Sequence, residues 1–374
     1  MILRVNMDLL IDSFRDKDKI LGILKNIQLE AKKLNSKVNI MEVCGGHTHS
    51  IMKYGLNKIL PENIDFIHGP GCPVCVMPKN RINQAYKIAQ QKDTILLTLG
   101  DMIRIPGSNG SLQKARSEGC DVRFVYSPLE SLKIAKENKN KKIVFFAIGF
   151  ETTTPMTAAL IDKTLEQGVD NLFFHINHLL VPPPLRVILH SKPCNINALI
   201  APSHVSVITG AKIYLPLLTY NIPIVVGGFE PFDIMDSVFR IIKQINANQA
   251  KLDIQYNRVV TMEGNLRAQE LINKYFVTRE DFEWRGLGNI KDSTLRLRDE
   301  YSRIDAEVIF DNILPKEHIS DNKLCICGDI LRGIAKPTDC KVFSKVCTPQ
   351  NPIGSCMVSN EGACAAYYKY KDVI

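Results

Sequence analysis

The sequence predicts an α/β fold: two parallel-sheet domains that face a central cleft, followed by a mainly helical, cysteine-rich C-terminal domain. Three observations support this prediction. Short apolar runs rich in Val, Ile and Phe alternate with helical patterns, which is typical of βαβ units. Polar loops that contain glycine follow most of these runs, and six of the eleven cysteines lie in the last 50 of 374 residues.

The elements are predicted in chain order as follows. Residues 1–37 form an N-terminal helical segment, because apolar positions recur at helical spacing within it. Four strands fall within 38–125 and four within 126–240, which we interpret as α/β domains I and II because eight strands are too many for one compact sheet. Residues 241–374 form the third domain. The predicted strands are VNIMEV (38–43), IDFIHG (64–69), TILLTLG (94–100), VRFVY (122–126), KIVFFAIGF (142–150), NLFFHI (171–176), NALIAPS (197–203) and IPIVVGGF (222–229).

The composition narrows the class of protein. Apolar residues make up 45% and charged residues 23% of the chain, and the formal net charge is +8, as in an ordinary globular protein. No basic stripe interleaved with aromatic residues is present, so we expect no nucleic-acid partner. No signal peptide or membrane span is recognised. We therefore expect a cytoplasmic protein without membrane contact, in which cysteines bind metals or act as catalysts more often than they form structural disulfides.

Unusual polar motifs follow the predicted strands directly. Ligands of open α/β sheets bind beyond the carboxyl ends of the strands, so a cleft between the two domains would be lined by these loops. The motifs are CGGHTHS (44–50), GPGCPVC (69–75), GDMIRIPGS (100–108), GFETTTP (149–155), NH (177–178), PSH (202–204) and GGFEP (227–231).

The C-terminal cysteines suggest a metal cluster. The spacing C-x14-C-x6-C-x16-C lacks the paired knuckles of zinc sites, and widely spaced cysteines suit the four corners of an iron–sulfur cluster. Zinc binding and buried structural thiols remain alternatives, and the spacing alone does not settle which four of the six cysteines are ligands. The four in this pattern are Cys325, Cys340, Cys347 and Cys364, which leaves Cys327 and Cys356.

Two strand-end motifs contain reactive residue types. Cys44, His47 and His49 in CGGHTHS would suit a soft or borderline metal such as iron, or a cysteine nucleophile activated by histidine. A packing role for a single strand-end cysteine is the alternative. Cys72 and Cys75 form a C-x-x-C pair, which in a cytosolic α/β protein indicates a redox dithiol, with half of a zinc site as the alternative.

The remaining candidates come from two other loops. Thr152, Thr153 and Thr154 in GFETTTP can cap a helix, or their hydroxyls and the helix amides can hold an anion. The loop is not a Walker A motif, because GxxxxGK[ST] is absent. Asp101 in GDMIRIPGS is a secondary candidate.

Taken together, these motifs resemble those of the HypD family of hydrogenase maturation factors over nearly the whole chain. The matching stretches are MEVCGGHTHS, HGPGCPVCV, TLGDMIRIPGS, GFETTTP, GGFEPFDI, EWRGLG and the four spaced cysteines. The resemblance implies a scaffold that works in assembling the Fe(CN)2CO group of [NiFe] hydrogenases. It also implies two α/β domains, a [4Fe-4S] domain, and partners of the HypC chaperone type and the HypE cyanide-donor type.

The resemblance also implies roles for individual residues. By position, the four spaced cysteines match the cluster ligands, and Cys44 matches the cysteine that binds the iron under construction, shared with HypC. Cys72 and Cys75 match a redox dithiol near the cluster, while His47 and the threonine loop match cleft positions. Cys327 and Cys356, which the cluster leaves unused, are candidates for a second redox pair.

Alternatives from other classes are a thiol–disulfide oxidoreductase that uses the cluster to reduce a protein disulfide, and a zinc-stabilised metabolite-binding protein. The first leaves the separate Cys–His loop CGGHTH without a purpose, and the second does not use the C-x-x-C pair. The scaffold role requires no turnover, so no enzymatic reaction is assigned. No nucleotide-binding motif supports an ATPase role.

Overall fold

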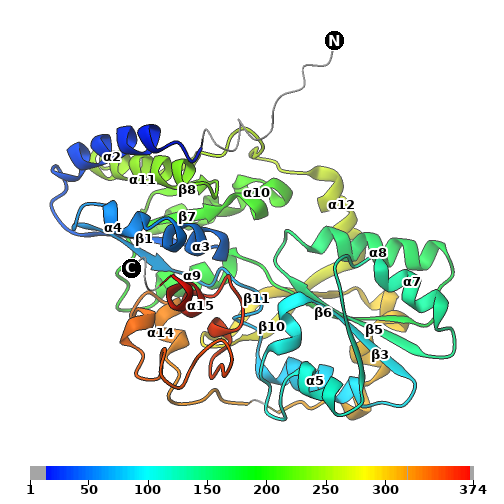
Figure 1. Cartoon of the computed structure of the whole chain (residues 1–374). Coiled ribbons are helices and arrows are strands. Elements are labelled where there is room, and N and C mark those ends of the chain that lie inside the picture. Colours follow the sequence, from blue (N-terminus) through cyan, green and yellow to red (C-terminus); the bar gives the residue numbers. More distant parts are fainter. Residues whose placement is uncertain (1–13, 318, 371–374) are drawn as a thin grey trace.

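The computed structural model describes residues 14–317 and 319–370 and has the predicted α/β architecture (Figure 1). One parallel sheet has five strands in the order β2-β1-β7-β8-β9. Its strands are β1 (Val38–Glu42), β2 (Ile64–His68), β7 (Ala198–Pro202), β8 (Ile224–Gly227) and β9 (Leu252–Ile254). We call it the first sheet.

Successive side chains along the strands of the first sheet point to opposite faces, and each face packs into a separate core. Ile40 packs with α2 (Lys17–Ala31) and α11 (Pro231–Asn246) on one face, where these two helices lie side by side in Figure 1. Met41 points into the core on the opposite face. The predicted N-terminal helix is thus present as α2, capped by the Asp16 side chain, which accepts from the amides of Asp18 and Lys19. The part of that prediction before residue 14 lies outside the described residues.

A four-stranded parallel sheet, the second sheet, has the order β4-β3-β5-β6. Leu97 faces α8 on one side, and Leu96 faces α5 on the other, as expected for strands buried on both faces. The elements are β3 (Thr94–Leu99), β4 (Asp121–Val125), β5 (Lys142–Gly149), β6 (Leu172–His178), α5 (Lys79–Ala89), α6 (Leu112–Ser117), α7 (Glu130–Glu137) and α8 (Thr154–Glu166).

The assignment of strands to sheets differs from the predicted division at residue 125. β3 and β4 belong to the first predicted domain but share a sheet with β5 and β6, through the pairing of β3 with β5, whereas β7 and β8 join β1 and β2. The physical reason is that parallel strands are joined by crossovers, so neighbours in the chain need not be neighbours in a sheet. The segment from β3 to β6 is therefore an insertion in the chain between β2 and β7, two strands of the first sheet.

A β-hairpin lies in the region predicted to be mainly helical. α12 (Leu266–Tyr275) leads into β10 (Phe276–Trp284), which pairs antiparallel with β11 (Gly288–Leu297). The turn uses Gly286 and Gly288 at φ of +80° and +83°, a conformation that favours glycine. The Leu180 amide donates to the Ser293 carbonyl, so the hairpin contacts the chain just after β6.

Short elements complete the fold. The cysteine-rich C-terminal segment contains only short helices joined by loops, and α15 packs on α3, the helix that follows β1. Among the described residues, no helix is long and apolar enough to cross a membrane. The remaining elements are α3 (Gly45–Lys53), α4 (Leu56–Ile59), η1 (Gly100–Arg104), α9 (Pro182–His190), α10 (Ser203–Thr209), η2 (Ala211–Tyr220), η3 (Asp299–Ile304), α13 (Ala306–Ile309), η4 (Asp311–Ile313), α14 (Cys327–Leu331), η5 (Pro337–Asp339), η6 (Ser355–Met357) and α15 (Ala363–Lys369).

Candidate functional site

The candidate site begins where the first sheet reverses its strand order, between β1 and β7. Ligands of open parallel sheets bind at such a reversal, beyond the carboxyl ends of the strands. Cys44 follows β1 here, Ser203 follows β7 and Phe229 follows β8. The fold therefore brings three of the predicted loops, CGGHTHS, PSH and GGFEP, to one edge.

Cys44 caps the N-terminus of α3 in an extended conformation. Burial and the nearby carboxylates of Glu361 and Glu42 raise the pKa of its thiol to about 12, while the backbone amides of Gly46 and His47 oppose that rise. The thiol therefore keeps its proton at neutral pH until a metal ion or an electrophile displaces it. The helix amides then stabilise the thiolate that forms.

His47 is fully buried next to Cys44. Its Nε2 lies 3.0 Å from the Gly228 carbonyl and its ring stacks on Phe229 at 4.5 Å. Because a carbonyl only accepts, Nε2 carries the hydrogen, and Nδ1 keeps a lone pair that has no partner among the described residues. Burial lowers the pKa of His47, so the ring is neutral and Nδ1 keeps its free lone pair.

A cavity of about 500 Å³ opens beside the first turn of α3. Its lining includes Gly45, His49, His204, Phe229 and Glu361. His49 is held by the Tyr370 hydroxyl, 3.1 Å from its Nε2. Burial, and then the charge of Asp101, raise the pKa of Glu361. The structure thus adds Glu361, from the C-terminal segment, to the residues that the sequence motifs indicated.

The GPGCPVC loop lies directly against Cys44. A Cβ atom added to Gly71 would lie 2.4 Å from the backbone N and Cα of Cys44, so only glycine permits this approach. The Gly45 amide donates to the Gly71 carbonyl at 3.1 Å. Cys72 and Cys75 are buried and form a disulfide, with Cα atoms 5.2 Å apart. The two predicted thiol motifs are therefore neighbours.

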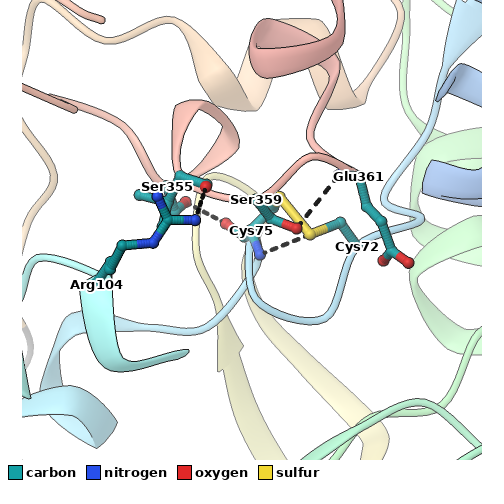
Figure 2. The surroundings of a disulfide bond; sticks show 7 residues. Cys72, Cys75, Arg104, Ser355, Ser359 and Glu361 are labelled. Atoms are coloured by element: carbon teal, nitrogen blue, oxygen red, sulfur yellow. Dashed lines mark hydrogen bonds between the residues drawn. A yellow bond between two sulfur atoms is a disulfide. The ribbon is translucent and has the colours of Figure 1, made fainter. Parts of the chain in front are cut away.

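The C-terminal segment closes over this disulfide, as Figure 2 shows. The Ser355 hydroxyl donates to the Cys75 carbonyl, and the Cys75 amide lies 3.2 Å from the Cys72 sulfur. Arg104 donates to the Val358 carbonyl at 3.0 Å and pairs with Asp101 at 2.8 Å. Asp101 therefore helps to fix the contact between the GDMIRIPGS loop and the C-terminal segment.

All six C-terminal cysteines line one enclosed cavity. Burial raises the pKa of Cys364 well above its ordinary value, and the charges of other cysteines in the cavity add to that effect. Cys327 lies beside both Cys325 and Cys356, so the two thiols left over by the predicted ligand pattern are neighbours. The lining cysteines are Cys325, Cys327, Cys340, Cys347, Cys356 and Cys364.

This donor set fits an iron–sulfur cluster. Several thiolates in one enclosed cavity repel one another, so they can ionise together only when cations compensate the charge. A Cβ atom on Gly354 would lie 2.6 Å from the Cys325 sulfur, and glycine at this position therefore leaves the sulfur room. A [4Fe-4S] cluster held here would place each of four thiolates on a separate iron.

The threonine loop occupies the equivalent position on the second sheet, where the strand order reverses between β3 and β5. The hydroxyls of Thr153 and Thr154 both donate to the Phe150 carbonyl at 3.2 Å. Local hydrogen bonding thus accounts for these two threonines, but not as the capping interpretation predicts: Thr153 occupies the N-cap of α8 without a side-chain capping hydrogen bond. Thr152 lies in the same turn without a hydrogen bond that assigns it a role.

Glu151, in this loop, is a buried acid that the sequence analysis did not single out. One carboxylate oxygen accepts from the Val181 amide at 2.9 Å, and the other has no partner among the described residues. Burial raises the pKa of Glu151 to about 7. Burial raises the pKa of Tyr214, and the charges of Glu151 and then of Cys44 raise it further. Glu151 therefore reaches from the second sheet toward the Cys44 region.

Replacing Glu151 by glutamine is expected to change how stability depends on pH. The folded carboxyl, with a pKa of about 7 against 4.5, keeps its proton while the unfolded one loses it, so its contribution is full below pH 4.5 and is lost as pH rises toward 7. At about 1.4 kcal/mol per pH unit this amounts to roughly 3 kcal/mol. Glutamine is neutral at every pH, so the variant should not show this fall in stability. Urea unfolding of both proteins from pH 4.5 to 8 measures it, and parallel pH profiles would contradict the prediction.

The fold and the site define a thiol-rich α/β protein in which a strand-end cysteine, a disulfide and a six-cysteine cavity lie together. The model of the HypD family, described as the hydrogenase formation hypA family, matches residues 18–371. Hydrogenase maturation factor HypD2 of Bradyrhizobium diazoefficiens is 46% identical over 96% of both chains, and HypD of Cupriavidus necator is 45% identical over 96% of both. HypD of Escherichia coli is 43% identical over 96% of this chain and 98% of its own. The chain belongs to the HypD family of hydrogenase maturation factors.

Proposed function

We propose that this protein holds an iron ion on Cys44 while cyanide and carbonyl ligands are installed for a [NiFe] hydrogenase. A HypC-type chaperone would share the iron, and a HypE-type protein would deliver the cyanide. The observation that carries the proposal is the close approach of Gly71 to the Cys44 backbone. This approach places the loop of Cys44, a thiol suited to iron, beside the loop of the C-x-x-C disulfide. Membership of the family supports the same process.

The Cys44 loop supplies the chemistry that holding iron requires. The Cys44 thiol must lose its proton to bind iron, and the amides of Gly46 and His47 stabilise the resulting thiolate. His47, in the same loop, keeps an unpartnered Nδ1. The open cavity beside α3 gives partner groups access to this end of the helix.

The disulfide supplies a redox function. Reduction of the Cys72–Cys75 bond takes two electrons and two protons and yields two thiols. We assign the neighbouring cysteine cavity to a [4Fe-4S] cluster held by Cys325, Cys340, Cys347 and Cys364; when bound, such a cluster accepts and donates single electrons. The disulfide shares one continuous core with Cys327 and Cys356, which we assign to a second redox pair.

The alternative function is a cluster-dependent thiol–disulfide oxidoreductase that acts on a protein disulfide. The burial of Cys72 and Cys75, which are 3% and 1% exposed, disfavours it, because a disulfide that exchanges with another protein needs an accessible sulfur. The adjacency of Cys44 also favours the scaffold, since a simple reductase has no use for a separate thiol at another strand end.

The deciding measurement is the iron and acid-labile sulfide content per chain. Anaerobic preparations of the wild type and of Cys44→Ala, each co-expressed with the partner proteins, would be compared. We expect about four sulfides in both and about five irons in the wild type, falling to about four in the variant. Equal iron in both would remove the support for the scaffold and favour the reductase. Zinc in place of iron would overturn the cluster assignment.

A further inference from the structure

Arg285, from the EWRGLG motif, joins three segments of the redox region. Its backbone amide donates to the carbonyl of Val76, the residue after Cys75, at 2.8 Å. Its guanidinium donates to the Asp321 carboxylate at 2.8 Å and to the Pro106 carbonyl at 3.3 Å. The side chain is only 4% exposed. One buried arginine therefore ties the disulfide loop to the GDMIRIPGS loop and to the segment that precedes Cys325.

The turn that carries Arg285 also touches the cysteine cavity. A Cβ atom on Gly328 would lie 2.3 Å from the Gly286 carbonyl oxygen, so the two backbones are in contact at the residue next to Cys327. Cys327 lines the cysteine cavity together with Cys325 and Cys356, so the turn that carries Arg285 packs directly against the wall of that cavity.

The charge of Arg285 is poorly screened, unlike that of the other arginine near the disulfide. The side chain of Arg104 is 42% exposed, so solvent weakens its field. Asp321, the partner of Arg285, is 32% exposed and also lies 3.6 Å from Lys79. The buried end of the Arg285–Asp321 pair is thus the positive one. In a low-dielectric interior such a charge acts strongly on nearby groups.

We propose that Arg285 is a positioning residue that fixes the disulfide loop against the cysteine cavity and raises the reduction potential of the centre bound there. A positive charge stabilises the more negative, reduced state of such a centre. Asp321 works in the opposite direction by partly neutralising that charge. This inference rests on the proposed iron–sulfur function of the cavity.

The test is an anaerobic redox titration of the full-length, iron-loaded protein, monitored by its iron–sulfur absorbance and paramagnetic signal. Arg285→Gln is expected to lower the equilibrium constant for reduction about tenfold, which is a fall of about 59 mV for a one-electron couple. Arg285→Lys keeps the positive charge, so the reduction potential should fall less in this variant than in Arg285→Gln. Asp321→Asn, the matched control, leaves the arginine charge uncompensated and should raise the potential.

Each outcome decides the inference. The inference is overturned if the equilibrium constants for reduction of both Arg285→Gln and Asp321→Asn stay within threefold of the wild-type value. It is also overturned if the two variants shift the potential with the same sign. If Arg285→Gln does not fold, Asp321→Asn decides alone, and a potential that does not rise overturns the proposal. Wild-type protein without sulfide would refute the cavity function itself, whereas a loaded cavity with unchanged potentials refutes only the role of Arg285.

Discussion

Replacing Cys72 by alanine is expected to abolish hydrogenase maturation while leaving the iron and sulfide content of the protein unchanged. Cys72 forms the disulfide with Cys75, so the variant cannot cycle between disulfide and dithiol. It does not line the six-cysteine cavity, and the cluster assigned to that cavity should persist. Hydrogenase activity in cells that depend on the variant, together with iron and sulfide analysis of the purified protein, measures both effects.

Cys194→Ala is the matched control, because Cys194 is an exposed, free cysteine and its loss should change neither quantity. Full hydrogenase activity with Cys72→Ala would sink the redox role of the pair. Thiol mapping by mass spectrometry of the same preparations after mild oxidation should find Cys327 linked to Cys356, as their contact suggests. Two persistently free thiols would end that assignment.

Replacing Glu307 by alanine should lower the free energy of unfolding by about 3–5 kcal/mol. Glu307 accepts from Arg81 at 2.7 and 2.8 Å and from Arg279 at 2.6 and 3.2 Å. Arg81 is 5% exposed and also donates to the Asn177 side chain at 2.6 Å. Without the carboxylate, the buried guanidinium group of Arg81 and the partly buried one of Arg279 would face each other uncompensated.

Urea unfolding of the variant and of Glu300→Ala provides the measurement. Glu300 is an exposed acid in η3, so its removal should change stability by no more than about 0.5 kcal/mol. A loss below about 1 kcal/mol for Glu307→Ala would mean that the network is not buried in solution. The arginines come from α5 and β10 and the acid from α13, so the variant also weakens the attachment of the helix after the disulfide.

The fold class could be predicted because fully buried parallel strands leave a strong sequence pattern. VNIME at 38–42 and KIVFFAIG at 142–149 are strands in the structure. Which strands share a sheet could not be predicted, because the pairing of β1 with β7 depends on crossovers and not on sequence distance. The hairpin was missed because the ladder shifts register between Arg279 and Asp281, which interrupts the period-two burial pattern of β10.

The candidate site was predictable where a motif concentrates rare residue types. Cys44 and the C-x-x-C pair stand out in sequence, and the structure brings their loops together. Glu361 and Arg285 did not stand out, since acids and arginines are common and only their burial beside thiols makes them notable. Glu151 had a weak signal, as a charged residue directly after the apolar strand 142–149.

The insertion of the second sheet into the first has a consequence for biosynthesis. β1 and β2 leave the ribosome early, but β7, which pairs with β1, and the next strand β8 follow only after the whole second sheet has been made. The segment that covers the disulfide, including Ser355, comes last. At roughly 5–20 residues per second, the nascent chain therefore displays Cys44 for many seconds before its pocket exists. The cavity beside α3 is lined partly by Glu361, so an incomplete chain lacks the finished site that we propose for iron.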